Sequence, residues 1–234
     1  MISVCIATYN GEQYIQEQLK SILKQLDKED EVIVSDDGSK DKTLDKINEL
    51  HDDRVKVIQN TLEHGYTKNF ENALNHSKGD YIFLADQDDV WCDTKVEECI
   101  KVLQKYPFVV HDAIMVDSEL NVFDESQFHR YNVRPGFLHT FVRNRYNGCC
   151  MACTREFLSK ALPFPKNQHL CRQDYWLPYL AEFHKDGFML EKGLILYRRH
   201  EGTTLNAGES SSRSLYEKIV SRFYILFEVL KRRY

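Results

Sequence analysis

The stretch Tyr81-Ile82-Phe83-Leu84-Ala85-Asp86-Gln87-Asp88-Asp89 joins a short apolar run to three carboxylates within four positions. Such a run predicts a buried strand, so the acidic cluster stands where the strand ends. Crowded carboxylates repel one another and need a counter-charge. A cation that prefers oxygen ligands, Mg²⁺ or Mn²⁺, supplies that charge and commonly bridges carboxylates to a diphosphate. The alternative is an acidic, solvated turn, but a turn seldom lies between an apolar strand and Val90-Trp91.

Around this strand, the first hundred residues alternate strands with helices. Apolar runs predict strands over 2–8, 31–35, 55–59 and 81–85. Apolar residues at helical spacing predict helices over 11–26, 41–50, 67–77 and 94–105. This order indicates βαβ units, and therefore an α/β fold with a mainly parallel sheet. Ligands of such sheets bind at the carboxyl ends of the strands.

Two further polar clusters follow predicted strands. Thr8-Tyr9-Asn10 comes after the first, and Asp36-Asp37-Gly38-Ser39 comes after the second. A carboxylate at a strand end can accept a hydrogen bond from a nucleobase N–H or a ribose hydroxyl, and an aromatic ring can stack on a base. A turn with a helix N-cap explains the second cluster equally well. Three such strand ends together predict one ligand site.

The second half is less regular. The sequence predicts a strand over 108–116, loops with aromatic residues over 117–145, and a helix over 173–184 despite Pro178. It then predicts a strand or hairpin over 188–197, and either a lid or a plain linker over 201–214. The last residues, 215–234, form an amphipathic helix candidate rich in Lys and Arg. A helix of this kind either lies on an anionic membrane or packs on its own protein or a second subunit.

Composition excludes several classes of protein. The net charge of −5 argues against nucleic acid as a general partner. The chain has no apolar run of the ~20 residues that span a bilayer, and it starts without a basic, signal-like segment, so we expect a cytoplasmic protein. The seven cysteines are scattered along the chain, which is typical of a protein whose thiols stay reduced. The cluster of Cys149, Cys150 and Cys153 is either half of a zinc site or, as we favour, a set of small buried hydrophobes.

Taken in order and spacing, these motifs resemble family 2 of the nucleotide-sugar glycosyltransferases. The resemblance rests on Ala7-Thr8-Tyr9-Asn10-Gly11, residues 34–41, Gly79-Asp80-Tyr81-Ile82 and residues 86–91. It continues through Asn144-x-x-x-Gly148-Cys149-Cys150-Met151-Ala152, Asp174-Tyr175-Trp176 and Tyr197-Arg198-Arg199-His200, which are similar to bacterial surface-polysaccharide enzymes, including rhamnosyltransferases.

The resemblance implies a GT-A fold in which a Rossmann-like nucleotide half is fused to an acceptor half. The implied divisions are 1–106 for the nucleotide-sugar half, 107–205 for the acceptor-binding and catalytic half, and 206–234 for a flexible segment and C-terminal helix. It also implies a UDP- or dTDP-sugar donor, a glycan or lipid-linked glycan acceptor, Mg²⁺ or Mn²⁺, and inversion at the anomeric carbon. The chain lacks the Gln-x-x-Arg-Trp motif of processive synthases, which favours transfer of a single sugar.

Residue roles follow from the matched positions. The nucleotide-binding residues would be Thr8, Tyr9, Asn10, Asp36, Asp37 and Asp86, the metal ligands Asp88 and His200, and a donor-sugar contact Asp89. Two further donor-sugar or acceptor candidates come from the sequence pattern: Asp112, which we place at another strand end, and the aromatic Trp176. Asp174 is the candidate general base, because an inverting transfer needs a carboxylate to take the acceptor proton. Asp174 could equally be a helix N-cap, His200 a structural residue and Trp176 a core residue. Gln173 departs from the acid or His that many relatives carry.

The residues after the first strand and the acidic cluster also bear on two other functions. A sugar-nucleotide nucleotidyltransferase would need a Gly-rich, basic phosphate loop after the first strand, and Ala7-Thr8-Tyr9-Asn10-Gly11-Glu12 does not supply one. A catalytically inactive relative that binds only a nucleotide or a partner enzyme is the remaining alternative. The acidic cluster and Asp174 argue against it.

Overall fold

The computed structural model describes residues 1–200 and 214–232. Its strands are β1 Ile2–Thr8, β2 Glu31–Asp36, β3 Val55–Gln59, β4 Tyr81–Ala85, β5 Val90–Trp91, β6 Phe108–Val116, β7 Val122–Asp124, β8 Met151–Thr154 and β9 Gly187–Arg198. Its helices are α1 Ile15–Leu23, α2 Thr43–Asn48, α3 Tyr66–His76, α4 Lys95–Leu103, α5 Gln127–Tyr131, α6 Phe137–Val142, α7 Arg155–Ala161, α8 Gln173–His184 and α9 Leu215–Lys231. A 3₁₀ turn, η1, covers Gly148–Cys150.

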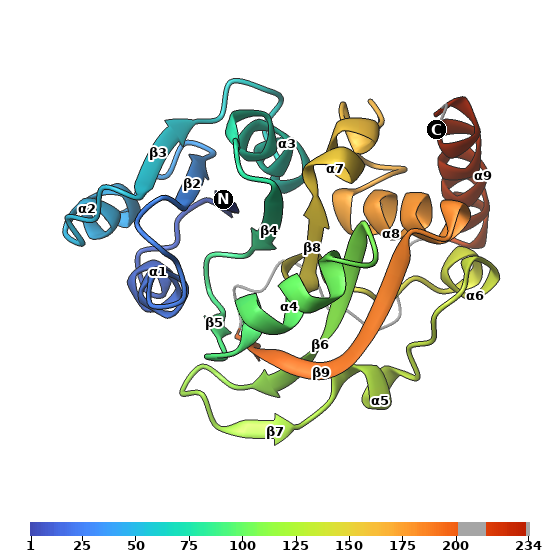
Figure 1. Cartoon of the computed structure of the whole chain (residues 1–234). Helices are drawn as coiled ribbons and strands as arrows, with labels where there is room; N and C mark the ends of the chain where they lie inside the picture. The colour runs from blue at the N-terminus through green and yellow to red at the C-terminus, as the bar shows by residue number, and fades with distance from the viewer. Residues whose placement is uncertain (201–213, 233–234) are drawn as a thin grey trace.

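Within the described residues, nine strands form one sheet in the order β3-β2-β1-β4-β8-β6-β9-β5, with β7 paired to β6 (Figure 1). The pairs among β1, β2, β3 and β4 are parallel, as the alternation of strands and helices predicted. The sheet then changes direction, because β8 is antiparallel to both β4 and β6. The long strand β9 runs parallel to β6 and antiparallel to β5. The α/β prediction is confirmed, and the sheet is mixed beyond β4.

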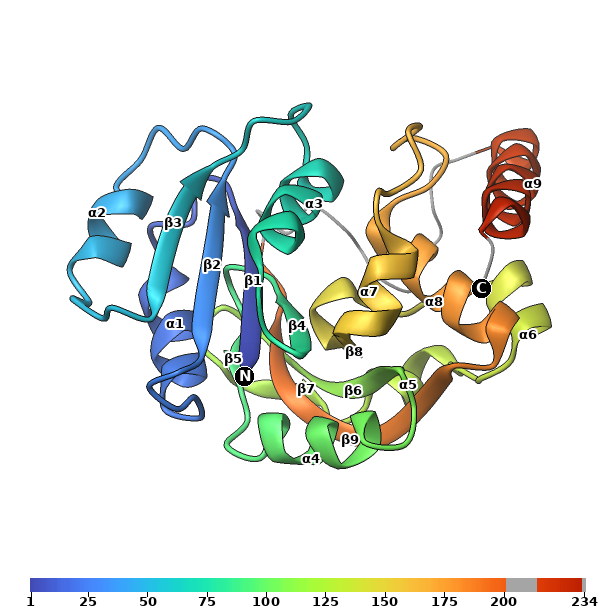
Figure 2. The same cartoon turned by 45° about the horizontal axis from the view of Figure 1, so that its top comes forward.

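Helices cover the sheet because the strands are apolar on both faces. Val4, Val32 and Phe83 are fully buried on one face, and Cys5 and Leu84 are fully buried on the other. Helix α3 packs on β1 and β2, and α1 packs against α2 and β5 (Figure 2). Burying a large aliphatic or aromatic side chain contributes about 1.5–3 kcal/mol, so this core accounts for most of the gross stabilisation.

The structure refines the predicted element bounds in the second half. The segment 117–145, read as loops, contains β7, α5 and α6. The strand or hairpin expected over 188–197 is a single strand of 12 residues. Helix α8 has the predicted bounds and includes Pro178. The part of the expected lid or linker over 201–213 lies outside the described residues.

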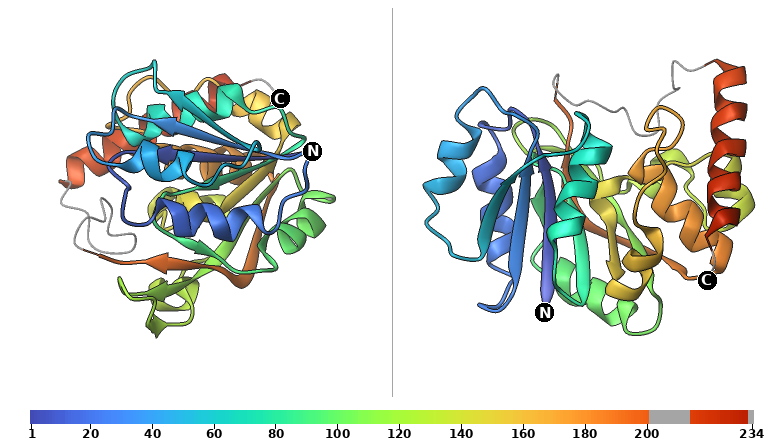
Figure 3. Two further views of the ribbon diagram at one scale, coloured as in Figure 1. Left: turned by 90° about the vertical axis from the view of Figure 1, so that its left-hand side faces the viewer. Right: turned by 90° about the horizontal axis from the view of Figure 1, so that it is seen from above.

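The C-terminal helix α9 stands at the edge of the molecule opposite α2 and packs against α8 (Figure 3). Ser221, Ile225 and Val229 form its buried side. A capping box fixes its start, with the Ser214 hydroxyl accepting from the Glu217 amide while the Glu217 carboxylate accepts from the Ser214 amide. None of the helices in the described part of the chain combines the length and apolar character that crossing a bilayer requires.

Candidate active site

Strand register brings the three polar clusters to one edge of the sheet. Thr8 pairs with Asp36 across β1 and β2, and Ile6 pairs with Ala85 across β1 and β4. The residues that follow these strands are therefore neighbours, as the parallel arrangement predicted.

Gln87 joins the first and third clusters. Its side-chain oxygen accepts from the Thr8 hydroxyl at 2.6 Å and from the Tyr9 amide at 2.9 Å, and its amide nitrogen donates to the Tyr9 carbonyl. A Cβ at Gly11 would lie 2.5 Å from the same oxygen, so any larger residue there would push the Gln87 side chain out of these contacts. Thr8 is 1% exposed, so its hydroxyl serves this contact, while Tyr9 is 47% exposed at the rim.

Asn10 and Asp36 fix the loop after β2. The Asn10 side-chain oxygen accepts from the Lys40 backbone amide, and the Asn10 backbone amide donates to the Ser39 hydroxyl. The Asp36 carboxylate accepts from the amides of Gly38 and Ser39 and from the Ser39 hydroxyl. These two side chains therefore hold the shape of the loop, and the next residue, Asp37, is left to face the site.

Asp37 is surrounded by hydrogen-bond donors. One carboxylate oxygen accepts from the Asn60 side chain at 2.7 Å, and the other lies 2.9 Å from His64 Nδ1 and 2.8 Å from the Gly65 amide. The His64 ring also meets the Tyr9 ring edge to face, with centroids 5.3 Å apart. An ionised carboxylate has about four acceptor positions, so one remains for a ligand N–H beside the Tyr9 ring.

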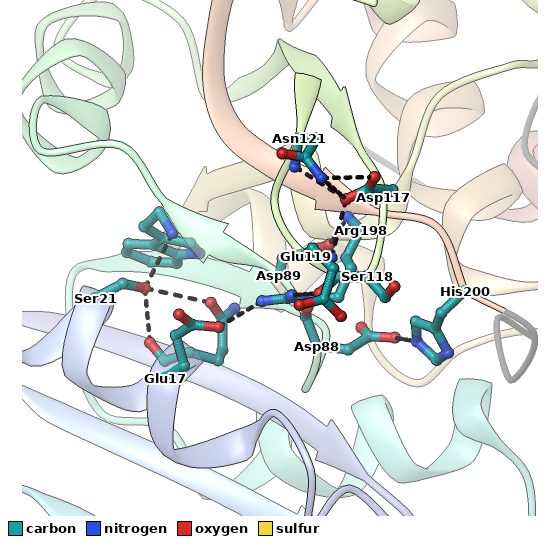
Figure 4. Close-up of polar contacts among 12 residues, drawn as sticks. Glu17, Ser21, Asp88, Asp89, Asp117, Ser118, Glu119, Asn121, Arg198 and His200 are labelled. Carbon is teal, nitrogen blue, oxygen red and sulfur yellow. Dashed lines mark hydrogen bonds and ion pairs between the residues drawn. The ribbon is translucent and has the colours of Figure 1, made fainter. Parts of the chain in front are cut away.

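The acidic loop after β4 meets the end of β9. His200 Nε2 lies 2.9 Å from an Asp88 carboxylate oxygen (Figure 4). The centroid of the His200 ring is 4.9 Å from that of Tyr14. The two residues expected to bind a cation are thus in contact although 112 positions separate them in sequence. Both side chains are 18% exposed, so the pair is reachable from solvent.

Arg198 holds the acidic loop in place. Its backbone amide donates to the Asp89 carboxylate at 3.0 Å, and its Nε donates to the Asp88 carbonyl at 2.8 Å. Its two terminal nitrogens donate to the Ser118 carbonyl and the Glu17 carboxylate, each at 2.5 Å (Figure 4). The Arg198 side chain is 3% exposed, so few of these contacts compete with water.

Replacing Arg198 with methionine is expected to lower the free energy of unfolding by about 2–4 kcal/mol, because two partly buried carbonyl groups and the Glu17 carboxylate lose their donor. Urea unfolding measures this change. The control is Arg130→Met, which breaks the partly exposed pair with Asp124 and should change stability by less than about 1 kcal/mol. Equal losses in the two variants would show that Arg198 does not support the loop.

The other two carboxyl groups of the loop, those of Asp86 and Asp89, have raised pKa values. Burial, followed by the charge of Asp88, raises the pKa of Asp86 to about 7. The same causes raise the pKa of Asp89 well above its ordinary value. Asp174 also contributes to the shift at Asp86, which places its charge near the loop. A cation bound at this loop would reverse the effect, because it favours the ionised carboxylates.

Asp174 lies in the first turn of α8 and is largely buried. Arg172 donates to both of its carboxylate oxygens, from Nε at 3.1 Å and from a terminal nitrogen at 2.9 Å. Pro178 has no N–H to donate to the Asp174 carbonyl four residues earlier, and that carbonyl accepts from the Asn144 side chain instead, at 2.7 Å. The proline and Asn144 together explain how this turn is positioned.

Asp112 and Trp176, which the sequence suggested as contacts of the donor sugar or acceptor, occupy other positions in the fold. Asp112 lies in the middle of β6, not at a strand end, and its carboxylate accepts from the amides of Ala113 and Phe128 and from the Ser126 hydroxyl. Trp176 is 0% exposed, and its indole N–H donates to the Ala161 carbonyl. Asp112 therefore anchors the α5 connection, and Trp176 belongs to the core.

Sequence reasoning missed several residues that shape the site. Gln87 lies in the motif at residues 86–91 and Arg198 in the motif at residues 197–200, but neither motif indicates what these two side chains contact. His64 and Asn60 carry no motif, and only the tertiary structure brings them to Asp37. Lys95, which is fully buried, was read simply as part of a helix.

Comparison with known proteins identifies the family. The model of the family described as Glycosyl transferase family 2 matches residues 3–162. This chain belongs to glycosyl transferase family 2. It is therefore a family 2 glycosyltransferase, and its acidic loop and both neighbouring clusters lie within the matched region.

Similar proteins are bacterial. UDP-Glc:alpha-D-GlcNAc-diphosphoundecaprenol beta-1,3-glucosyltransferase WfgD of Escherichia coli is 28% identical over 76% of this chain and 68% of its own length. dTDP-rhamnosyl transferase RfbG of Shigella flexneri is 28% identical over 88% of this chain and 75% of its own.

Solved structures show the same GT-A fold. S. aureus TarS 1-349 in complex with UDP-GlcNAc has a TM-score of 0.74 at 21% identity, and the match covers all of this chain and 67% of that one. Glucosyl-3-phosphoglycerate synthase from Mycobacterium tuberculosis, in complex with Mn²⁺, UDP and glucosyl-3-phosphoglycerate, has a TM-score of 0.61 at 18% identity, covering 99% of this chain and 79% of that one.

Proposed function

We propose that this glycosyltransferase moves one sugar from a UDP- or dTDP-sugar to a glycan or lipid-linked glycan, with inversion, in the synthesis of bacterial surface polysaccharide. The observation that carries the proposal is the meeting of three groups at one sheet edge: the Asp37 pocket, the pair of Asp88 and His200, and Asp174. The names of the relatives support the donor class and the bacterial glycan.

The donor base is proposed to bind beside Tyr9, with its N–H directed to Asp37. Uracil and thymine both present an imide N–H that a carboxylate accepts, so this pocket serves UDP and dTDP alike. Asp86 is the first residue of the acidic loop, directly after β4, and it would contact the ribose or the donor sugar. Asp89 would lie near the cation or the sugar. Thr8, Asn10 and Asp36 are proposed to act on the nucleotide through the loops that they hold.

The residues present fit a divalent cation. Asp88 offers a carboxylate oxygen and His200 an imidazole nitrogen, and the two are 2.9 Å apart and partly exposed. A carboxylate suits both Mg²⁺ and Mn²⁺, while an imidazole ligand is less usual for Mg²⁺, so we favour Mn²⁺. When bound, the cation neutralises charge on the leaving diphosphate.

Asp174 is proposed to take the proton of the acceptor hydroxyl as that oxygen attacks the anomeric carbon. The bond from that carbon to the diphosphate breaks, and the nucleoside diphosphate leaves from the opposite face, which inverts the configuration. Arg172 stabilises the charged form of Asp174 and fixes its direction.

In this proposal residues 1–106 bind the donor, residues 107–205 bind the acceptor and carry the base, and the chain from 206 onward ends in α9. The halves share one continuous sheet, since β8 joins β4 to β6. The donor half supplies Asp37 and Asp88, and the acceptor half supplies Asp174 and His200.

Thermal-shift binding with UDP, dTDP, GDP and CMP, each with and without Mn²⁺, tests the donor site. A ligand that binds only the folded state stabilises it by about 2.7 kcal/mol at a hundredfold excess over the dissociation constant. We expect a Mn²⁺-dependent shift for UDP or dTDP and none for CMP. No shift with any nucleotide would contradict the donor site and favour the inactive alternative.

We also propose that α9 and α6 contact the cytoplasmic face of the cell membrane. Apolar side chains are exposed along both helices: Leu138, Val142, Tyr216, Ile219, Phe223, Phe227 and Leu230. Helix α9 also carries the cationic side chains of Lys218 and Arg222. A lipid-linked acceptor, of the kind named for WfgD, would hold the reaction at a membrane.

Flotation with anionic phosphatidylglycerol vesicles measures this contact. We expect the protein to float, and the double variant Phe223→Ser with Phe227→Ser to stay in the dense fraction, because apolar burial supplies the binding energy. The matched control is Phe123→Ser, which removes an exposed aromatic ring from β7. Equal flotation of all three proteins would argue against a role for α9.

A further inference from the structure

Helix α3 is fixed to the donor half of the chain. It packs on β1 and β2, and the Asn69 side chain donates to the Thr8 carbonyl at 3.1 Å. Immediately before the helix, the Gly65 amide donates to the Asp37 carboxylate at 2.8 Å. The residues that form the proposed base pocket therefore also set the position of α3.

Another face of α3 meets the acceptor half. The Thr67 hydroxyl donates to the Gln173 side-chain oxygen at 2.9 Å. The Glu71 carboxylate accepts from the Phe164 amide, also at 2.9 Å. Thr67 and Glu71 are four positions apart, so they lie on one face of the helix. Figure 2 shows α3 standing between the strands β1 and β2 and the helices α7 and α8, so this helix bridges the two halves.

The contact of Thr67 with Gln173 reaches the turn that carries the proposed base. Gln173 directly precedes Asp174 in the first turn of α8. Burial alone would lower the pKa of Arg172, but Asp174 and then Tyr66 raise it above its ordinary value, so Tyr66 lies near the guanidinium that holds Asp174. Two consecutive residues at the start of α3 therefore meet two consecutive residues at the start of α8.

We propose that Thr67 and Gln173 are positioning residues for sugar transfer, which hold Asp174 at a fixed distance from the donor pocket through α3. The inference rests on the proposed function, in which Asp174 is the base. Thr67 is 2% exposed and Gln173 is 4% exposed, so they act through their contact and not by touching a substrate. Misplacing a reacting group by ~1 Å can cost about 10²-fold in rate. An amide at position 173 makes the contact without adding a second negative charge beside Asp174.

Thr67→Val tests the proposal, because valine keeps the shape of threonine and removes the hydroxyl that donates to Gln173. We expect kcat to fall about tenfold in single-turnover kinetics, while the Mn²⁺-dependent binding of UDP or dTDP stays within about twofold. Thr67→Ser keeps a hydroxyl and should have a kcat within about twofold of the parent. Equal kcat values for the two variants would overturn the proposal.

The partner side chain gives an independent check. Gln173→Met also removes the contact, so the double variant with Thr67→Val should lose no more kcat than the more damaging single change. Losses that multiply would show that the two side chains act separately, against the proposal. If Thr67→Val does not fold, Gln173→Met is compared with Thr67→Ser in its place.

Thr154→Val is the matched control. The Thr154 hydroxyl also makes its contact at the start of a helix, where it accepts from the Phe157 amide at 3.3 Å, but none of the proposed site residues lies in α7. We expect a lower urea midpoint with kcat unchanged. The same result for Thr67→Val, a lower midpoint at the parental kcat, would show that Thr67 supports only the fold.

Amide hydrogen exchange measures the contact without any assay of catalysis. The amides of Tyr175 and Trp176 donate to the Arg172 carbonyl in the first turn of α8. In the free protein we expect these amides to exchange at least about fivefold faster in Thr67→Val than in Thr67→Ser, because the turn opens more readily. Equal exchange would overturn the proposal. If the parent transfers no sugar at all, the proposed function fails, while the exchange result still decides whether Thr67 holds the turn.

Discussion

Replacing Asp88 with asparagine is expected to remove the Mn²⁺ dependence of nucleotide binding and to lower kcat/KM for sugar transfer by about 10³-fold. The amide keeps the size of the side chain but loses the negative charge that holds the cation and pairs with His200 at 2.9 Å. A cation that neutralises the leaving diphosphate contributes several kcal/mol to the transition state, and about 4 kcal/mol corresponds to 10³-fold. Steady-state kinetics and thermal shift with UDP and dTDP measure the two effects.

Asp93→Asn is the matched control for this variant. Asp93 is an acid close to the same loop, but its side chain is 81% exposed and pairs with Lys24 on the surface. We expect its kinetics to equal those of the parent. Sugar transfer by Asp88→Asn at the parental rate would remove the role assigned to Asp88.

Replacing Asp174 with asparagine is expected to lower kcat by about 10²–10⁴-fold while Mn²⁺-dependent nucleotide binding stays within about twofold. The change removes the proposed base but not the donor pocket, and general-base catalysis accounts for an effect of this size. Single-turnover kinetics with a saturating donor measure the chemical step, and thermal shift measures binding. The split between the two readouts separates a base from a residue that merely supports the fold.

Glu156→Gln provides the comparison. Glu156 also lies in the first turn of a helix and pairs with a cation, Lys160, but its side chain is 77% exposed on α7. We expect parental activity from it. A structural role for Asp174 would show instead as a lower free energy of unfolding with kcat unchanged, because Arg172 would lose its partner.

Part of this site could be predicted from the sequence because parallel strands end at a common edge. The apolar runs before Thr8, Asp36 and Asp86 placed these residues at strand ends, and the structure brings them together. The same reasoning did not work for Asp112, because the strand continues beyond it to Val116. It could not decide whether Trp176 faces a sugar or the core, because one face of a mostly apolar helix looks like another.

The residues that position the site, Arg198 and His64, could not be predicted from the sequence for a different reason. Arg198 acts on Asp89 from 109 positions away, and His64 reaches Asp37 from a loop without a motif. Local patterns report which atoms could form a contact but not which atoms meet. The pairing of β9 with β5 decides the meeting of Arg198 with Asp89, whereas the loop between β3 and α3 brings His64 to Asp37.

By itself, then, the sequence determined the alternating elements, the parallel half of the sheet, the membership of the motifs in one family and the acidic chemistry at the strand ends. These properties depend on local apolar spacing and on residue type. Only the tertiary structure decided which carboxylates the fold already satisfies, as in Asp36 and Asp112. It also decided that Asp37 keeps one acceptor position and that one Asp89 oxygen has no hydrogen-bond partner. The physical reason is that hydrogen-bond partners and burial come from segments far apart in the chain.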